Sequence, residues 1–161
     1  EKDYLVKELN LKDMVQKAVR SNARIMISNK IKISMNNLDQ KIFSDEKWLL
    51  FILNQIISNA VKYKKEDPQI SFEARQSTNQ IFLEIRDNGI GIAAKDLPRV
   101  TDKGYTGTTG RNYEKSTGMG LYLCKKLCDK LHLSFKIESK EEEYTIVTIG
   151  FPRSSMIFLN E

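Results

Sequence analysis

The sequence predicts an α+β fold, an α/β sandwich in which a mixed, mostly antiparallel sheet of about five strands is covered on one face by about three helices. Two observations carry this prediction. Segments with an apolar residue at every second position occur in pairs joined by short turns, which is typical of antiparallel hairpins with one buried face. Other segments repeat their apolar residues with the 3.6-residue period of a helix, so each has one face to bury.

The length and composition are those of one globular domain. The chain has 161 residues, 40% of them hydrophobic, and a net charge of +5. These values exclude wholesale disorder and collagen-like structure. The longest apolar run, from Trp48 to Leu53, is six residues, against the roughly 20 that a membrane span requires. The charge favours an anionic partner, but the basic residues are dispersed and no nucleic-acid-binding motif is present, so we expect no nucleic-acid partner.

The N-terminal half predicts two helices and four strands. Residues 1–10 are polar and resemble the end of a preceding helix or linker. Asn10 is a candidate N-cap for the first helix, and Ser44 or Asp45 for the second and most apolar one. This second helix should end near Asp67-Pro68, because a residue before proline disfavours the helical conformation. The predicted strands are 30–36, a short one around 42–43, 69–76 and 80–87.

The C-terminal half contains a glycine-rich segment, a helix and two strands. Seven of the eight glycines fall between Gly89 and Gly120, and residues 103–117 are almost devoid of apolar side chains. A segment of this kind inside a compact domain is usually a functional loop or lid. The following helix carries Cys124 and Cys128 on its apolar face, and we expect buried thiols there rather than a metal site. The last predicted elements are strands at 134–138 and 144–151, an acidic turn at 140–143 and a tail at 153–161.

Three polar or glycine-rich clusters are candidates for chemistry. The first is a stripe on one face of the second helix, formed by Gln55, Asn59, Lys62 and Tyr63. A solvent-facing surface is the alternative for this stripe, since buried polar groups need partners.

The second cluster begins with Asp87 at the end of a strand and continues through Gly89, Gly91 and Ile92. Glycines let a flat ligand lie against the main chain, and a carboxylate can accept a hydrogen bond from the amine of an adenine. The third cluster, residues 116–121, opens the next helix, where free N–H groups favour phosphate, and Lys103, Arg111 and Lys115 precede it. A plain Asn-Gly turn and a glycine-rich N-cap are the respective alternatives.

In this order, the three clusters resemble the motifs of sensor histidine kinases. Residues 55–63 resemble the N box, Asp87 to Gly91 the G1 box, and Gly118 to Leu121 the G2 box. Residues 30–151 are therefore similar to the catalytic ATP-binding domain of these kinases, whose Bergerat-type fold with a Gly-rich ATP lid is shared with gyrase, Hsp90 and MutL. The sequences of residues 103–111 and 116–124 are similar to those of small Gram-positive kinases that respond to bacitracin-type antimicrobial peptides.

The resemblance implies a role for each matching residue. Asn59 would hold the Mg²⁺ that bridges the ATP phosphates, Lys62 would contact phosphate and Tyr63 would pack beside the adenine. Asp87 would accept a hydrogen bond from the adenine amine, and Gly91 would give the base room. The implied catalytic residues are Gln55, Asn59, Lys62 and Arg111. The further implied ATP contacts are Gly89, Ile92, Lys103, Tyr105, Thr106, Gly107, Arg111, Thr117, Gly118, Met119, Gly120 and Leu121.

The resemblance also implies an activity and partners. The chain would donate the γ-phosphoryl group of ATP to a histidine on a separate dimerisation domain, with a cognate response regulator as a further partner. The one histidine, His132, follows the third cluster, so we do not expect it to be the phosphoacceptor. Residues 1–10 would be the linker from the dimerisation domain and 11–152 the catalytic domain. The full-length protein would be a membrane-anchored homodimer with this domain in the cytoplasm, and the fragment alone a monomer.

Departures from the family pattern leave other functions open. Gln55 stands where gyrase-like relatives have a catalytic Glu, and a neutral amide cannot take a proton from water, which disfavours an efficient clamp-type ATPase. Near the expected Phe-rich box the chain has Thr101 and Tyr105, so packing of the lid there departs from the family. A serine kinase and a catalytically silent nucleotide-binding module share the same boxes and remain alternatives.

Overall fold

The computed structural model describes residues 4–103 and 120–154. The strands are β1 (Val6–Asn10), β2 (Lys32–Asn36), β3 (Lys41–Asp45), β4 (Gln69–Gln76), β5 (Gln80–Asp87), β6 (Ser134–Lys140) and β7 (Tyr144–Pro152). The helices are α1 (Leu11–Ser21), α2 (Ala23–Ser28), α3 (Glu46–Lys62), the short 3-10 helix η1 (Leu97–Arg99) and α5 (Gly120–Lys130). Within the described ranges, none of these helices has both the length and the apolar content that a bilayer crossing demands.

The main sheet has five strands in the order β2-β4-β5-β7-β6. Only β2 and β4 are parallel, and the other neighbouring pairs are antiparallel. Both predicted hairpins, β4–β5 and β6–β7, are present, and the bounds of β4 and β5 are those expected from their alternation. The predicted mixed, mostly antiparallel five-stranded sheet is therefore confirmed.

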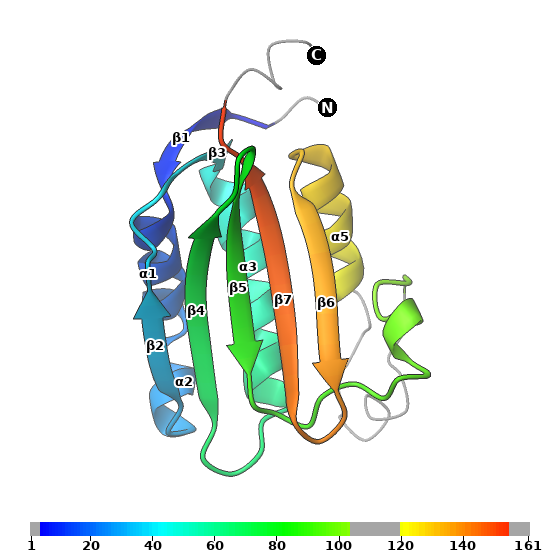
Figure 1. Cartoon of the computed structure of the whole chain (residues 1–161). Coiled ribbons are helices and arrows are strands. Elements are labelled where there is room, and N and C mark those ends of the chain that lie inside the picture. The colour runs from blue at the N-terminus through cyan, green and yellow to red at the C-terminus, as the bar shows by residue number, and fades with distance from the viewer. Residues whose placement is uncertain (1–3, 104–119, 155–161) are drawn as a thin grey trace.

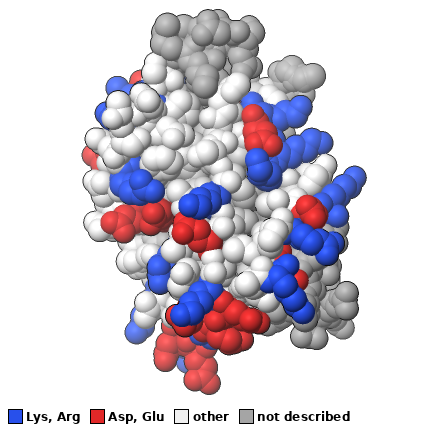
Figure 2. Space-filling view, turned by 45° about the vertical axis from the view of Figure 1, so that its right-hand side comes forward, with Lys and Arg blue, Asp and Glu red and all other residues white. Residues whose placement is uncertain are grey.

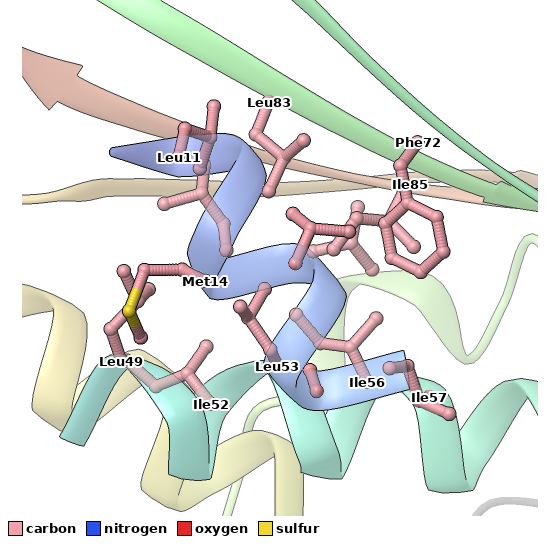
Figure 3. Packing of buried hydrophobic residues seen from close by; sticks show 14 of the residues in the cluster. Leu11, Met14, Leu49, Ile52, Leu53, Ile56, Ile57, Phe72, Leu83 and Ile85 are labelled. Atoms are coloured by element: carbon pink, nitrogen blue, oxygen red, sulfur yellow. The ribbon is translucent and has the colours of Figure 1, made fainter. Parts of the chain in front are cut away.

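Helices α1, α3 and α5 cover one face of this sheet, and in Figure 1 they lie behind it. Helix α3 is central and contacts both α1 and α5. Figure 3 shows the resulting core, in which Leu53 and Ile56 of α3 point toward Phe72 and Ile85 of the sheet. All four side chains are buried, so the predicted helical layer on one face is confirmed. The short helix α2 was not anticipated, since only Met26 of its six residues is buried.

The N-terminal segment differs from expectation. Residues 6–10 are not the end of a helix but strand β1, which pairs with β3 in a separate two-stranded antiparallel sheet. The Asp45 carboxylate adds a contact, because its Oδ2 accepts a hydrogen bond from the Leu5 N–H at 2.7 Å. The helical interpretation is wrong for these residues because β3 supplies main-chain partners that the local sequence does not reveal. An origin as a linker from a preceding domain stays a prediction.

The sequence predicted the N-terminal end of α3 correctly but not its C-terminal end. Asp45 is the N-cap, as expected, and its Oδ1 accepts from the Trp48 N–H at 3.0 Å. The C-terminal end lies at Lys62 rather than near Asp67-Pro68. The Tyr63 carbonyl, which could have extended the helix, instead accepts a hydrogen bond from the Ile90 N–H at 3.0 Å. A tertiary contact therefore ends the helix before the proline signal.

Candidate functional site

Asp87 is the last residue of β5, and its side chain is on the sheet face that the helices cover. Leu83 and Ile85, which point to the same face, are buried, and Asp87 is partly buried at the end of this row. Its Oδ1 accepts a hydrogen bond from the Gly89 N–H at 2.9 Å. Among the residues that the structure describes, none donates to Oδ2. Within the described residues, one carboxylate oxygen is thus committed to the loop and the other has no donor.

The electrostatics of Asp87 match this arrangement. Desolvation raises its pKa from an ordinary 3.8 to about 6, while the Gly89 N–H and the Arg86 guanidinium act in the opposite direction with smaller effects. A carboxylate that has lost water without gaining enough partners is stabilised by any donor that a ligand brings. An exocyclic amine, as in adenine, is a donor of this kind.

The loop after Asp87 is held on two sides. The Ile90 N–H donates to the Tyr63 carbonyl at the end of α3, and the Ile90 carbonyl accepts from the Glu142 N–H in the β6–β7 turn at 2.5 Å. A Cβ on Gly89 would lie 2.5 Å from the Tyr63 carbonyl oxygen. The missing side chain of Gly89 therefore allows the N box and the G1 box to join through their main chains.

Gly91 has a different neighbour from the one expected. Its φ is +70°, and a Cβ there would overlap the main chain of Lys140 and Glu141 in the β6–β7 turn. Packing of the loop against this turn is thus sufficient to require glycine. The further role that the resemblance implies, giving an adenine ring room, stays a prediction.

Replacing Gly91 with alanine is expected to lower the free energy of unfolding by about 2–4 kcal/mol, because of the left-handed φ and the overlap with Lys140. Urea unfolding followed by circular dichroism measures this change. Gly120→Ala is the matched control, since among the described residues its Cβ would meet only the end of the Gln55 side chain, and alanine favours helix. Its effect should stay below about 1 kcal/mol, and equal losses in the two variants would contradict the packing argument.

The stripe on α3 reaches from this loop to the start of α5. Gln55, Asn59, Lys62 and Tyr63 are all half-buried rather than solvent-facing. A Cβ on Gly120, the first residue of α5, would lie 2.8 Å from Gln55 Oε1. At the other end, the Lys62 Nζ lies 5.6 Å from the centroid of the Tyr63 ring. Helix α3 therefore lies against Gly120 at the start of α5, and Tyr63, which follows its last residue, is bonded to the loop after Asp87.

The remaining predicted residues divide into described and undescribed ones. Ile92 is half-buried in the loop, Leu121 is half-buried in the first turn of α5, and the Lys103 Nζ lies 5.9 Å from the centroid of the Tyr122 ring on α5. Among the described residues, no hydrogen bond or ring contact joins Lys103 to the loop after Asp87. The predicted residues that lie outside the described ranges are Tyr105, Thr106, Gly107, Arg111, Thr117, Gly118 and Met119.

Two further polar residues lie beside Asp87, and the sequence reasoning missed them. The strand register places Asp87, Thr145 and Ser139 in one row across β5, β7 and β6. The Ser139 hydroxyl accepts a hydrogen bond from the Ile92 N–H at 2.8 Å. The available signal was a polar residue at inward positions that are otherwise apolar, but the predicted strand ended at residue 138, one short of Ser139.

The cysteines and His132 lie apart from these contacts. Cys124 and Cys128 are free and buried, as expected, and burial raises the pKa of both thiols, that of Cys124 to about 12. His132 lies in the turn between α5 and β6, with a φ of +60°. In the part of the chain that the structure describes, no group of three or more His, Cys, Asp or Glu is arranged to hold a metal ion.

The surface charge is mixed. Figure 2 shows Lys and Arg interleaved with Asp and Glu over the visible face, with a dense acidic group at its lower end. The β6–β7 turn lies at this end in Figure 1, and its Glu141, Glu142 and Glu143 are exposed. The acidic turn thus borders the loop after Asp87, to which it is joined by the Glu142 N–H.

Comparisons with known sequences agree on one family. A family profile described as "Histidine kinase-, DNA gyrase B-, and HSP90-like ATPase" matches residues 44–155. The chain is 35% identical over 153 residues to the sensor histidine kinase YxdK and 37% identical over 152 residues to the sensor protein BceS, both of Bacillus subtilis (strain 168). It is 32% identical over 157 residues to the sensor histidine kinase GraS of Staphylococcus epidermidis (strain RP62A). The alignments cover 94–97% of this chain but only 45–47% of these relatives, so the chain spans about half their length.

Solved structures share the fold. The catalytic domain of histidine kinase ThkA, in a nucleotide-free form, aligns with a TM-score of 0.79 at 17% identity, over 92% of this chain and 98% of that one. The mycobacterial sensor histidine kinase MprB aligns with a TM-score of 0.79 at 16% identity, over 91% and 97% of the two chains. ThkA in complex with the response regulator protein TrrA aligns with a TM-score of 0.75 at 15% identity, over 94% of this chain and 42% of ThkA.

Proposed function

This chain belongs to the family of histidine kinase-, DNA gyrase B- and HSP90-like ATPases, and we propose that it binds Mg-ATP and donates the γ-phosphoryl group to a histidine on a separate dimerisation domain. The observation that carries the proposal is the position of α3. Its polar stripe contacts the loop after Asp87 at Tyr63 and the start of α5 at Gln55. The first two clusters and Gly120 of the third, which the sequence separates by up to 65 residues, therefore meet around one helix.

Asp87 forms the base end of the proposed site. Its Oδ2 accepts the hydrogen bond of the adenine amine, while Oδ1 remains on the Gly89 N–H. Binding replaces lost water with a donor, which offsets the desolvation that raises the pKa of Asp87. Tyr63 packs beside the adenine and Gly91 gives the base room in this proposal, the roles that the resemblance implies.

The phosphate end of the proposed site lies between α3 and the start of α5. Lys62 contacts a phosphate, and the Asn59 amide oxygen holds Mg²⁺, a cation that prefers oxygen ligands and is usually bound by few protein groups together with substrate phosphates. A site of this kind needs no acidic cluster, which agrees with the described residues. Magnesium, when bound, supplies neutralisation of phosphate charge. The N-terminal N–H groups of α5 and its positive dipole end favour the same anion.

Further contacts of the proposed site come from residues whose sequence motifs match the family. Arg111 serves as a lid cation near the γ-phosphate, and Gly118 contributes main-chain donors. Lys103, Tyr105, Thr106, Gly107, Thr117, Met119 and Leu121 complete the proposed nucleotide contacts.

Phosphoryl transfer asks mainly for positioning and charge neutralisation, so this chain needs no nucleophile of its own. The acceptor is an imidazole nitrogen of another domain. His132 is not a candidate, because it lies in a turn at the opposite end of α5 from Gly120. Gln55 cannot act as a general base toward water, which favours transfer to histidine over steady hydrolysis.

We propose the partners and location on the same basis. ThkA has been solved with the response regulator TrrA, and a response regulator is the proposed further partner here. Residues 11–152 are the proposed catalytic domain, in the cytoplasm, of a membrane-anchored homodimer whose dimerisation domain precedes residues 1–10.

The test is a transfer assay with purified components. Incubation of the chain with Mg-ATP labelled at the γ-phosphate is expected to leave the chain itself unlabelled. Addition of a histidine-bearing dimerisation domain should yield acid-labile phosphate on that domain, and a variant with its histidine replaced by glutamine is the control. Steady release of inorganic phosphate without transfer would support an ATPase instead. Absence of ATP binding in calorimetry would overturn the proposal altogether.

A further inference from the structure

The Ser139 hydroxyl lies at a junction of three segments. Ser139 is the second-last residue of β6, next to the β6–β7 turn, and it is half-buried. Its Oγ lies 2.8 Å from the Ile92 nitrogen, 2.7 Å from the Tyr144 carbonyl oxygen and 3.0 Å from Thr145 Oγ1. These partners belong to the loop after Asp87 and to β7. One small side chain therefore connects the G1 loop to the hairpin beside it.

The direction of each hydrogen bond follows from counting donors. A serine hydroxyl has one proton to donate and two lone pairs to accept with. The proton goes to the Tyr144 carbonyl, which can only accept. The Ile92 N–H can only donate, so it takes one lone pair, and Thr145 Oγ1 must donate to the other. All hydrogen-bonding capacity of Ser139 is used, and without the hydroxyl no other described residue accepts from the Ile92 N–H.

The bond to Ile92 controls the second half of the loop. Its first half is fixed by the Ile90 N–H on the Tyr63 carbonyl and by the Glu142 N–H on the Ile90 carbonyl. Between these anchors and Ile92 lies Gly91, whose φ of +70° is in the left-handed region that glycine adopts without strain. Such a residue adopts other conformations readily unless both of its flanks are held. The Ser139 hydroxyl supplies the hold on the C-terminal flank.

We propose that Ser139 is a positioning residue for the nucleotide base, acting through the Ile92 N–H to hold the Gly91–Ile92 main chain of the loop after Asp87 in its observed conformation. This inference rests on the proposed function, because it makes Ser139 responsible for the main-chain conformation at the adenine-binding end of that site. Ser139 itself does not touch the nucleotide. The phosphate end, between α3 and α5, does not depend on it.

The binding test compares three variants of the full chain. Ser139→Ala is expected to weaken ADP binding roughly five- to tenfold, the size of one lost neutral hydrogen bond, whereas Ser139→Thr keeps the hydroxyl and should stay within about twofold of the parent. Ser134→Ala is the matched control, since Ser134 is an exposed serine at the other end of the same strand. Calorimetric titration with ADP gives the affinities, and titration with inorganic tripolyphosphate, which lacks a base, reports the phosphate end alone.

A purely structural role for Ser139 would also change the tripolyphosphate affinity and the amide hydrogen exchange at Ile85. Ser139→Ala should selectively increase amide hydrogen exchange at Ile92, with no change at Ile85 and no change in tripolyphosphate affinity. Equal losses for ADP and tripolyphosphate, or faster exchange at both amides, would show general loosening and overturn the inference. ADP binding by the parent with unchanged affinity in Ser139→Ala would overturn this inference alone. Absence of ADP binding by the parent would overturn the proposed function, and this inference with it.

Discussion

Replacing Asp87 with asparagine is expected to weaken ATP binding by about 10- to 100-fold while raising the free energy of unfolding of the nucleotide-free protein by about 2–3 kcal/mol. The loss of binding follows from the Gly89 N–H, which holds Oδ1 of residue 87 at 2.9 Å. Asparagine keeps an oxygen in that position, so its Nδ2 takes the place of Oδ2. A donor then faces the donor amine of the adenine.

The gain in stability follows from the raised pKa of Asp87. The pKa is about 6 in the folded protein against an ordinary 3.8, so the folded state binds a proton more tightly than the unfolded state does. The stability that this proton contributes is complete below about pH 4 and is lost as the pH rises through about 6. Above pH 6 the folded protein carries a desolvated charge, which asparagine does not have.

Urea unfolding of the parent and of Asp87→Asn without nucleotide, at a series of pH values, tests this. The free energies should coincide near pH 4 and diverge to their full difference above about pH 7. Equal stability at every pH would show that the carboxylate is not desolvated. Unchanged affinity for an ATP analogue in calorimetry would remove Asp87 from the base end of the site.

Replacing Asn59 with alanine is expected to abolish the magnesium dependence of ATP binding and to slow phosphoryl transfer by about 100-fold or more, the size typical of losing a group that stabilises developing charge. The amide oxygen of Asn59 is the proposed protein ligand of Mg²⁺, and alanine offers none. The helix should persist, because alanine has the highest helix propensity. Calorimetric titration with an ATP analogue, with Mg²⁺ and with a chelator, measures the dependence.

Asn54→Ala is the matched control for Asn59. Asn54 is on the same helix, but its Oδ1 accepts a hydrogen bond from Asn22 Nδ2 at 2.9 Å, at the end of α1. This variant should lose some stability and keep the full effect of Mg²⁺. If Asn59→Ala retained the same ratio of affinities with and without Mg²⁺, the ion would be held elsewhere.

Local sequence signals were sufficient where the determinants are local. The alternation in residues 69–76 and 80–87 and the Asp45 cap depend on neighbours along the chain, and all three appear as predicted. Local signals failed where a segment distant in the sequence sets the secondary structure. The bond from Ile90 to Tyr63 ends α3 early, and pairing with β3 makes residues 6–10 a strand.

The candidate site follows the same division. Residue types and their order along the chain were enough to name Gln55, Asn59, Asp87 and Gly120 as candidates, because the chemistry of an amide, a carboxylate or a glycine belongs to the residue itself; their roles stay predictions. The sequence did not reveal that Gly91 packs against Lys140 or that Ser139 holds Ile92. Both contacts join residues nearly 50 positions apart.

By itself, the sequence therefore determined which functional groups this protein carries and the spacing of apolar residues along its helices and strands. Both are properties of single residues and short segments. Only the tertiary structure decided which main-chain groups of the G1 loop are held, from which side, and which oxygen of Asp87 is left for a ligand. The physical reason is that hydrogen-bond partners and desolvation are set by neighbours in space, and here the C-terminal end of α3, Ser139 of β6 and the β6–β7 turn provide the partners.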